Sequence, residues 1–170
     1  ALVAGEPAGS AAAGRAMREA RVRIGFVFVS NHGVPQPAID GVFGAARDFF
    51  ALPDAQKEKA RVNERHRGWI GHGGAKMYTS AKVDLKESFV FGLELSEDDP
   101  DVAAGTPLMG PNQWPDALPA LQETVYPYYE AVLGLGQSVL RGLALSLGRD
   151  AGFFAQRFAR PLARGSLIWY

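Results

Sequence analysis

The three histidines are the residues best suited to hold a metal ion in this chain of 170 residues, which has no cysteine. A two-histidine, one-carboxylate iron site commonly takes two ligands from a His-x-Asp or His-x-Glu triplet. The triplets here are His32-Gly-Val, His66-Arg-Gly and His72-Gly-Gly, and none places a carboxylate two residues on. The HExxH and paired-cysteine spacings of zinc sites are absent too. We therefore predict no metal ligand and no catalytic residue in this chain.

The positions of the histidines indicate different roles. His32 ends the run FVFVSNH, where a hydrogen bond to backbone is its simplest role. His72 lies in the stretch 63–84, which is rich in glycine, has no periodicity and is the longest predicted loop. Long loops in compact domains are often functional. His72 is therefore the histidine that we expect beside a ligand.

Composition narrows the class of protein. Eighteen basic residues balance eighteen acidic ones, so there is no long-range field to attract nucleic acid or an acidic membrane. No apolar run approaches the roughly 18 residues of a membrane-spanning helix. The absence of cysteine suits a reducing cytoplasm. We expect a cytoplasmic protein with neither nucleic acid nor membrane as a partner, and the missing initiator methionine suggests a longer parent.

Several regular elements must position the loop. Helical periodicity and end signals predict helices over 10–25, 35–53, 54–62, 116–147 and 149–159. β-branched and aromatic runs predict strands over 26–32, 85–95 and 164–170. The nearly continuous apolar character of 26–29 predicts burial on both faces. Pro127 should kink the long helix, because it cannot donate to the carbonyl four residues back.

Seven stretches together resemble one family. In chain order they are GFVFVSNHGVP, FFALPDAQKEKA, RGW, DLKESFVFG, GPNQWPDALP, YYEAVLGLGQSVLRGLALSLG and RGSLIWY. Their order and spacing are similar to those of the non-haem iron, 2-oxoglutarate-dependent oxygenases related to isopenicillin N synthase. Pro115 restrains Trp114 to an extended backbone, which suits the indole as a packing anchor.

The resemblance implies an α+β fold in which a helical and strand region packs on a double-stranded β-helix, or jelly roll, that is largely missing here. Residues 1–165 would be this N-terminal region, and 166–170 the first strand leading into the jelly roll. The family's iron ligands and its clamp for 2-oxoglutarate lie beyond that point. We therefore expect Fe(II), 2-oxoglutarate and O2 as cofactors of the parent, with the iron ligands outside this chain and the remainder of the polypeptide as its partner.

The resemblance also implies which residues border the ligands. The substrate-contacting candidates are Arg67, Trp69, Ile70, His72, Tyr78 and Ser166. Ile168 and Tyr170 would border 2-oxoglutarate. Ser166, Ile168 and Tyr170 alternate along a predicted strand and should share one face. Arg67 could equally clamp a substrate carboxylate with two hydrogen bonds or form a structural ion pair. For Trp69 and Ile70 ordinary packing is the favoured alternative.

These residues leave three functions open. The first is the N-terminal part of an Fe(II)- and 2-oxoglutarate-dependent oxygenase that hydroxylates, desaturates or cyclises a small molecule, with this chain alone inactive. The second is an oxidase similar to isopenicillin N synthase, which needs no 2-oxoglutarate. The third is a non-catalytic binding or scaffold fragment. A reading frame that continues into the missing iron ligands would exclude the third.

Overall fold

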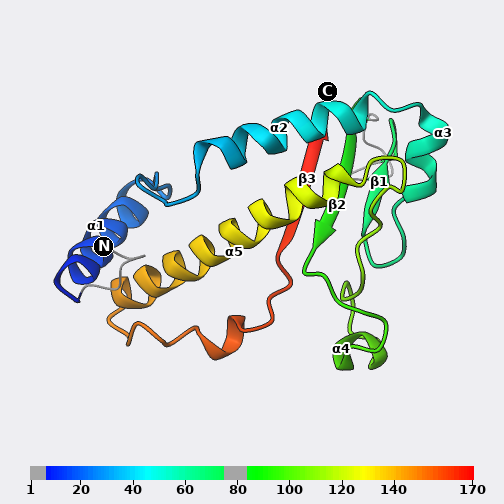
Figure 1. Cartoon of the computed structure of the whole chain (residues 1–170). Coiled ribbons are helices and arrows are strands. Elements are labelled where there is room, and N and C mark those ends of the chain that lie inside the picture. The colour runs from blue at the N-terminus through cyan, green and yellow to red at the C-terminus, as the bar shows by residue number, and fades with distance from the viewer. Residues whose placement is uncertain (1–6, 75–83) are drawn as a thin grey trace. The chain divides into compact units, whose positions relative to one another are not determined.

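The computed structural model describes residues 7–74 and 84–170 of the chain. Its elements are α1 (Pro7–Arg23), α2 (Gln36–Phe50), α3 (Asp54–Lys57), the 3-10 helix η1 (Glu58–Ala60), β1 (Gly68–Ile70), β2 (Glu87–Gly92), α4 (Pro100–Ala103), α5 (Ala120–Ser146), the 3-10 helix η2 (Gln156–Phe158) and β3 (Arg164–Trp169). The predicted mixture of helices and a few strands is confirmed (Figure 1). No helix in the described part of the chain is both long and apolar enough to cross a membrane.

The elements form two compact units. One consists of Ala1–Pro35 and Glu130–Pro161, and the other of Gln36–Tyr129 and Leu162–Tyr170. The long helix α5 therefore contributes its first part to the second unit and its remainder to the first.

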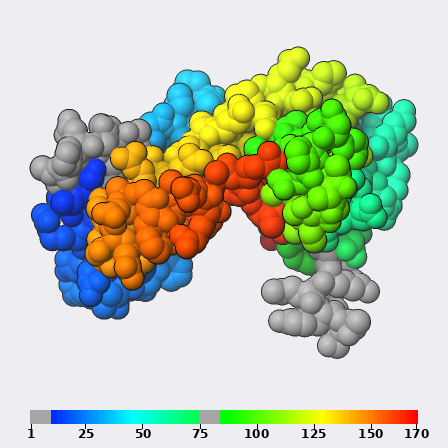
Figure 2. All heavy atoms as spheres, turned by 90° about the horizontal axis from the view of Figure 1, so that it is seen from below, coloured from blue at the N-terminus to red at the C-terminus, as the bar shows by residue number. Residues whose placement is uncertain are grey.

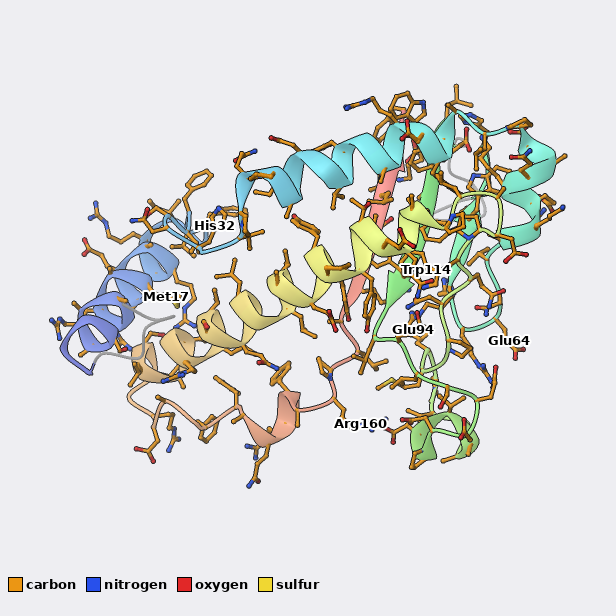
Figure 3. All side chains as sticks on the ribbon, in the orientation of Figure 1. Met17, His32, Glu64, Glu94, Trp114 and Arg160 are labelled. Carbon is orange, nitrogen blue, oxygen red and sulfur yellow. The ribbon has the colours of Figure 1, made fainter. Side chains whose placement is uncertain are left out.

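In the first unit, α1 packs against the end of α5. A Cβ atom on Gly14 would lie 3.0 Å from Cβ of Leu145, so a glycine is needed for this close approach. Nη1 of Arg18 donates to the carbonyl of Ser146 at 3.2 Å. Met17, labelled in Figure 3, is 7% exposed. These contacts bury one side of a helix that is otherwise mostly exposed.

Both ends of α1 can be compared with the ends that the sequence predicts. Gly25 follows the helix with a φ of +87°, and its N–H donates to the carbonyl of Ala20 at 3.2 Å. A left-handed glycine is a common helix end, and the predicted end is confirmed. The helix already includes Pro7, which is favourable in a first turn. It therefore begins ahead of the predicted start at residue 10.

The predicted strand over 26–32 is wrong. This segment forms no strand, and Phe26 and Phe28 are 78% and 102% exposed. A strand needs a neighbour to satisfy its backbone N–H and C=O groups, and no described strand pairs with this one. Asn31 and Gly33 do adopt positive φ angles of 52° and 80°, as expected for a turn after an extended run.

The second unit is built around a three-stranded antiparallel sheet in the order β1-β2-β3 (Figure 1). One face of the sheet is covered by helices. Phe49 at the end of α2 lies edge-on to Phe89 with ring centroids 4.9 Å apart, and Phe91 meets Tyr129 of α5 at 5.8 Å. Phe49 and Phe89 are fully buried. Apolar burial on this face holds the sheet to both helices.

Within α5, only some of the apolar side chains are buried. Leu121 and Val125 are fully buried, whereas Val132 and Leu147 are 39% and 47% exposed. The helix is assigned continuously across Pro127.

One strand begins where it was predicted, and another was not predicted. β3 begins at Arg164, the first residue of the strand predicted over 164–170. β1 is a strand of three residues inside the stretch predicted as one long loop. It was missed because three residues are too few to display a period of two.

Candidate functional site

The register of the sheet places several predicted site residues on one face. Directly opposed residues of an antiparallel sheet point to the same side. Two cross-strand rows share the side that we call the outer face: Ile70, Ser88 and Ile168, then Gly68, Val90 and Ser166. The prediction that Ser166 and Ile168 share a face is confirmed. The sheet therefore brings Ile70 to the same surface as these two residues.

The β3 side of the outer face is open. Ile168 is 50% exposed, and Tyr170, one residue beyond β3, is 81% exposed. Atoms of this last segment, drawn in red, reach the surface in Figure 2. Nζ of Lys86 lies 6.0 Å from the centroid of the Tyr170 ring. Among the described strands β3 pairs with β2 alone, so its second edge has no described strand beside it.

Behind the outer face, Glu87 accepts hydrogen bonds from two other elements. Nζ of Lys57 and Nε1 of Trp69 each lie 2.7 Å from its Oε2. Trp69 is 7% exposed and belongs to the helix-covered face. The structure therefore places Trp69 among packing residues. Lys57 is buried as well, because its side chain is 3% exposed and paired with a carboxylate 30 residues away.

The pKa of Lys57 reflects a balance between burial and pairing. Burial by itself lowers the pKa of an ammonium group, since it disfavours the charged form. The hydrogen bonds to Glu87 and Asp54 outweigh this effect and raise the pKa of Lys57 above its ordinary value. Lys57 is therefore a cation fixed inside the unit at neutral pH.

His72 is held at the edge of a surface pocket. Its Nε2 lies 3.1 Å from Oε1 of Glu87, and its side chain is 57% exposed. The pocket has a volume of about 320 Å³ and brings together three predicted residues, Trp69, Ile70 and His72. Its other walls come from α3, η1 and the residues beside them. The structure thus places His72 beside a cavity, where a ligand can reach it.

Arg67 is buried, not exposed to a ligand. It is 1% exposed, and its Nη2 donates to the carbonyl of Leu108 at 2.9 Å. Within the described residues its Nε and Nη1 have no hydrogen-bond partner. A Cβ atom on Gly92 would lie 2.6 Å from Nη2, so the guanidinium packs directly on that glycine. Burial lowers the pKa of Arg67 from its ordinary value.

A turn that sequence reasoning missed holds Arg67 in place. Oδ1 of Asn63 accepts from the backbone N–H groups of Arg65 at 3.0 Å and Arg67 at 3.1 Å. His66 within this turn has a φ of +54°. An Asn side chain that caps its own turn is a recurrent local motif. The signal was present in the sequence NERHR.

The Asn-x-Trp-Pro stretch is hydrogen-bonded to the end of β2. Asn112 exchanges two hydrogen bonds with the backbone of Gly92 and donates to Glu94, whose carboxylate also accepts from Nε1 of Trp114 at 2.7 Å. The ring of Trp114 packs 5.6 Å from that of Phe89. Figure 3 labels Glu94 and Trp114. The predicted role of Trp114 as a packing anchor is confirmed.

The remaining candidates divide as follows. Nδ1 of His32, labelled in Figure 3, accepts from the backbone N–H of Val34 at 3.1 Å, so the predicted backbone hydrogen bond is confirmed. Tyr78 lies outside the described residues. Among residues 7–74 and 84–170 no three histidine, aspartate or glutamate side chains gather closely enough to hold a metal ion.

Curated proteins similar to this chain are oxidoreductases. It is 32% identical to kihadalactone A synthase of Citrus sinensis over 143 residues, which cover 82% of this chain and 42% of that protein. It is 34% identical to the 2-oxoglutarate-Fe(II) type oxidoreductase hxnY of Emericella nidulans over 156 residues, 89% of this chain and 43% of that one. The chain thus spans less than half the length of these relatives.

Known structures give the same picture. A 2OG-Fe(II) oxygenase family protein from Caulobacter crescentus has a TM-score of 0.82 and 27% identity, covering 96% of this chain and 53% of its own. A full-length Neurospora crassa protein in complex with alpha-KG has a TM-score of 0.70 and 25% identity. This match covers 90% of this chain and 46% of the Neurospora protein. The family model described as non-haem dioxygenase in morphine synthesis N-terminal matches residues 2–117. The chain therefore belongs to this dioxygenase family and corresponds to the N-terminal region of its members.

Proposed function

We propose that this chain is the N-terminal part of a cytoplasmic Fe(II)- and 2-oxoglutarate-dependent oxygenase. The oxygenase would hydroxylate, desaturate or cyclise a small molecule. The observation that carries this proposal is the likeness to the Caulobacter oxygenase, which extends over 96% of this chain but 53% of that protein. A fold shared so completely by one part of a larger enzyme indicates the same place in a similar enzyme.

The described residues do not fit an iron centre. They contain no group of three potential ligands, whereas a non-haem iron site of this class needs two histidines and a carboxylate. We therefore assign no residue of this chain a step at the metal. The iron ligands would come from the remainder of the polypeptide.

The contribution of this chain is one wall of the substrate pocket. Ile70 and Ser166 present their side chains on the outer face, and His72 lies at the adjoining pocket; we propose that all three contact substrate. Arg67 and Trp69 would support this wall from inside, since both are buried. Tyr78 stays a proposed substrate contact on sequence grounds alone.

Ile168 and Tyr170 would border 2-oxoglutarate without forming ion pairs with its carboxylates. Both are exposed on or beside β3. A dicarboxylate needs cationic partners, while an isoleucine offers an apolar contact and a tyrosine one hydroxyl. These two residues fit a bordering role, and the groups that clamp the carboxylates would come from elsewhere.

The proposed partner of this chain is the remainder of its own polypeptide, folded as a jelly roll. Phe26 and Phe28 are 78% and 102% exposed in a run that would form a strand beside a suitable neighbour. The second edge of β3 has no described strand next to it. Exposed apolar runs and unpaired edges are usual where another strand docks.

Turnover by the full-length gene product tests the proposed function. The purified protein is given Fe(II), ascorbate and labelled 2-oxoglutarate, and released CO2 is measured. We expect the full-length protein to consume 2-oxoglutarate and the 170-residue chain alone to be inactive. A folded, iron-loaded full-length protein that consumes none would reject the proposal. Oxidation of a substrate without 2-oxoglutarate would favour the oxidase instead.

A further inference from the structure

The central rows of the outer face carry no ionisable side chain. Across the three described strands the face presents three branched aliphatic side chains and two hydroxyls: Ile70, Val90, Ile168, Ser88 and Ser166. Charged residues with the same alternation flank these rows at both ends: Arg164 lies opposite Gly92, and Lys86 directly precedes β2, with its Nζ 2.7 Å from Oδ2 of Asp84. The middle of this wall is therefore neutral and mostly apolar.

The buried charges beside the face are directed away from it. Glu87 lies on the helix-covered side, where Lys57 and Trp69 donate to its carboxylate. Arg67 is 1% exposed and donates to a backbone carbonyl. Neither charge is positioned to pair with an ion on the outer face.

This distribution discriminates between substrate classes. A charged group placed against the two central rows would lose its hydration without an ion partner in those rows, which is unfavourable. An aliphatic surface would gain free energy by burial against Ile70 and Val90. We infer that the wall selects a neutral, largely apolar small molecule and that Ser88 and Val90 contact it. The inference rests on the proposed function, because it assigns the substrate class of the same wall.

The two hydroxyls determine what polar group the substrate should carry. Ser88 stands between Ile70 and Ile168 in one row, and Ser166 lies opposite Val90 in the next. Oγ of Ser166 makes a long hydrogen bond of 3.5 Å to the carbonyl of Leu167, which a substrate oxygen at a shorter distance can replace. A serine hydroxyl both donates and accepts. A substrate hydroxyl or carbonyl satisfies it without burying a charge.

Matched sets of small molecules test the inference on the full-length protein. Each set keeps one skeleton and changes its charge, as in adamantan-1-ol, adamantane-1-carboxylate and adamantan-1-ammonium, with the same three groups on cyclohexyl and decyl skeletons. Binding is measured by the rise in Tm and by tryptophan fluorescence. We expect the alcohols to bind at least about tenfold more tightly than their charged analogues. A preference for acids or amines, or no alcohol bound, would overturn the inference.

Substitutions locate the bound alcohol. Ser166→Asp places a charge at an exposed position of the wall, and Val90→Asp places one at a half-buried position in the same row. Ser88→Asp is informative only if it folds, because Ser88 is 6% exposed. Ser30→Asp, at an exposed position of the first unit, is the matched control. We expect Ser166→Asp to weaken alcohol binding about tenfold or more and Ser30→Asp to leave it unchanged. Unchanged binding by a folded Ser166→Asp protein would contradict the assignment.

Substrate-free consumption of 2-oxoglutarate separates this inference from the proposed function. If the protein consumes no 2-oxoglutarate but still prefers alcohols, the oxygenase proposal fails and the neutral wall stands. If it consumes 2-oxoglutarate but prefers acids or amines, only the substrate class is wrong.

Discussion

Nζ of Lys57 lies 2.7 Å from Oε2 of Glu87, and the two side chains are 3% and 6% exposed. This buried ion pair joins α3 to the first residue of β2. Because Glu87 also accepts from Trp69 of β1 and contacts His72, one carboxylate links three segments that support the proposed substrate wall. Loss of this ion pair should therefore affect both the stability of the protein and the position of His72.

Lys57→Met should destabilise the protein strongly. The substitution leaves the Glu87 carboxylate buried without its cation, and such changes typically cost about 3–5 kcal/mol. Urea unfolding measures the loss. Lys59→Met, at a neighbouring exposed position, should change the free energy of unfolding by less than about 0.5 kcal/mol. Equal effects of the two substitutions would show that the ion pair has no stabilising role.

The same pair predicts a dependence on alkaline pH. The pKa of Lys57 is raised above 10.5 in the folded protein. A group whose folded pKa is raised stabilises fully below its unfolded pKa and loses that stabilisation as pH rises through the folded value. The stability difference between wild type and Lys57→Met should thus be constant from about pH 7 to about pH 10 and shrink above it. Unfolding titrations at several pH values test this, and a difference that grows with pH would contradict it.

The local sequence pattern predicted several features of the fold, because each of these signals lies within one short stretch of the chain. The apolar period of 35–53 identified α2, and Gly25 marked the end of α1 with a positive φ angle. The alternation of Ser166 and Ile168 placed both on one face. Each of these inferences needs only residues within one element.

Features that depend on distant partners could not be predicted. The charge on Lys57 is buried because Glu87, 30 residues later, neutralises it. Arg67 is buried because a carbonyl 41 residues away accepts from it. The run around Phe28 has strand propensity but no described neighbour to pair with. In each case tertiary context overrode the local pattern.

Gly92→Ala should destabilise the sheet. A Cβ atom at this position would lie 2.6 Å from Nη2 and 2.7 Å from Cζ of Arg67. Because Arg67 is buried and bonded to Leu108, its guanidinium cannot move freely aside. Overpacking of this kind costs about 1–3 kcal/mol. Gly134→Ala in α5 is the matched control, since nothing lies within 4 Å of its added Cβ, and it should stabilise by about 0.5–1 kcal/mol.

Asn112→Ala should loosen the end of β2. It removes the side-chain groups that satisfy the N–H and C=O of Gly92 at 2.8 and 2.9 Å. A buried backbone group left without a partner costs about 1–3 kcal/mol. Hydrogen exchange at Gly92 should speed up more than at Phe89, which stays within the β2–β3 ladder. Uniform acceleration across β2 would instead indicate global destabilisation.

Arg67→Met distinguishes a packing role from a substrate clamp. Replacing the buried guanidinium removes a charge and two nitrogen atoms, Nε and Nη1, that have no described hydrogen-bond partner, so it should change the free energy of unfolding by only about 1–2 kcal/mol. Arg67→Lys should destabilise more, because it keeps the buried charge but loses the planar group that packs on Gly92.

Substrate affinity of the full-length protein should change less than about threefold in either variant that folds, which is below 1 kcal/mol. Titration of substrate beside urea unfolding measures both quantities. Loss of binding in a fully stable Arg67→Met protein would restore the carboxylate clamp and exclude the packing role.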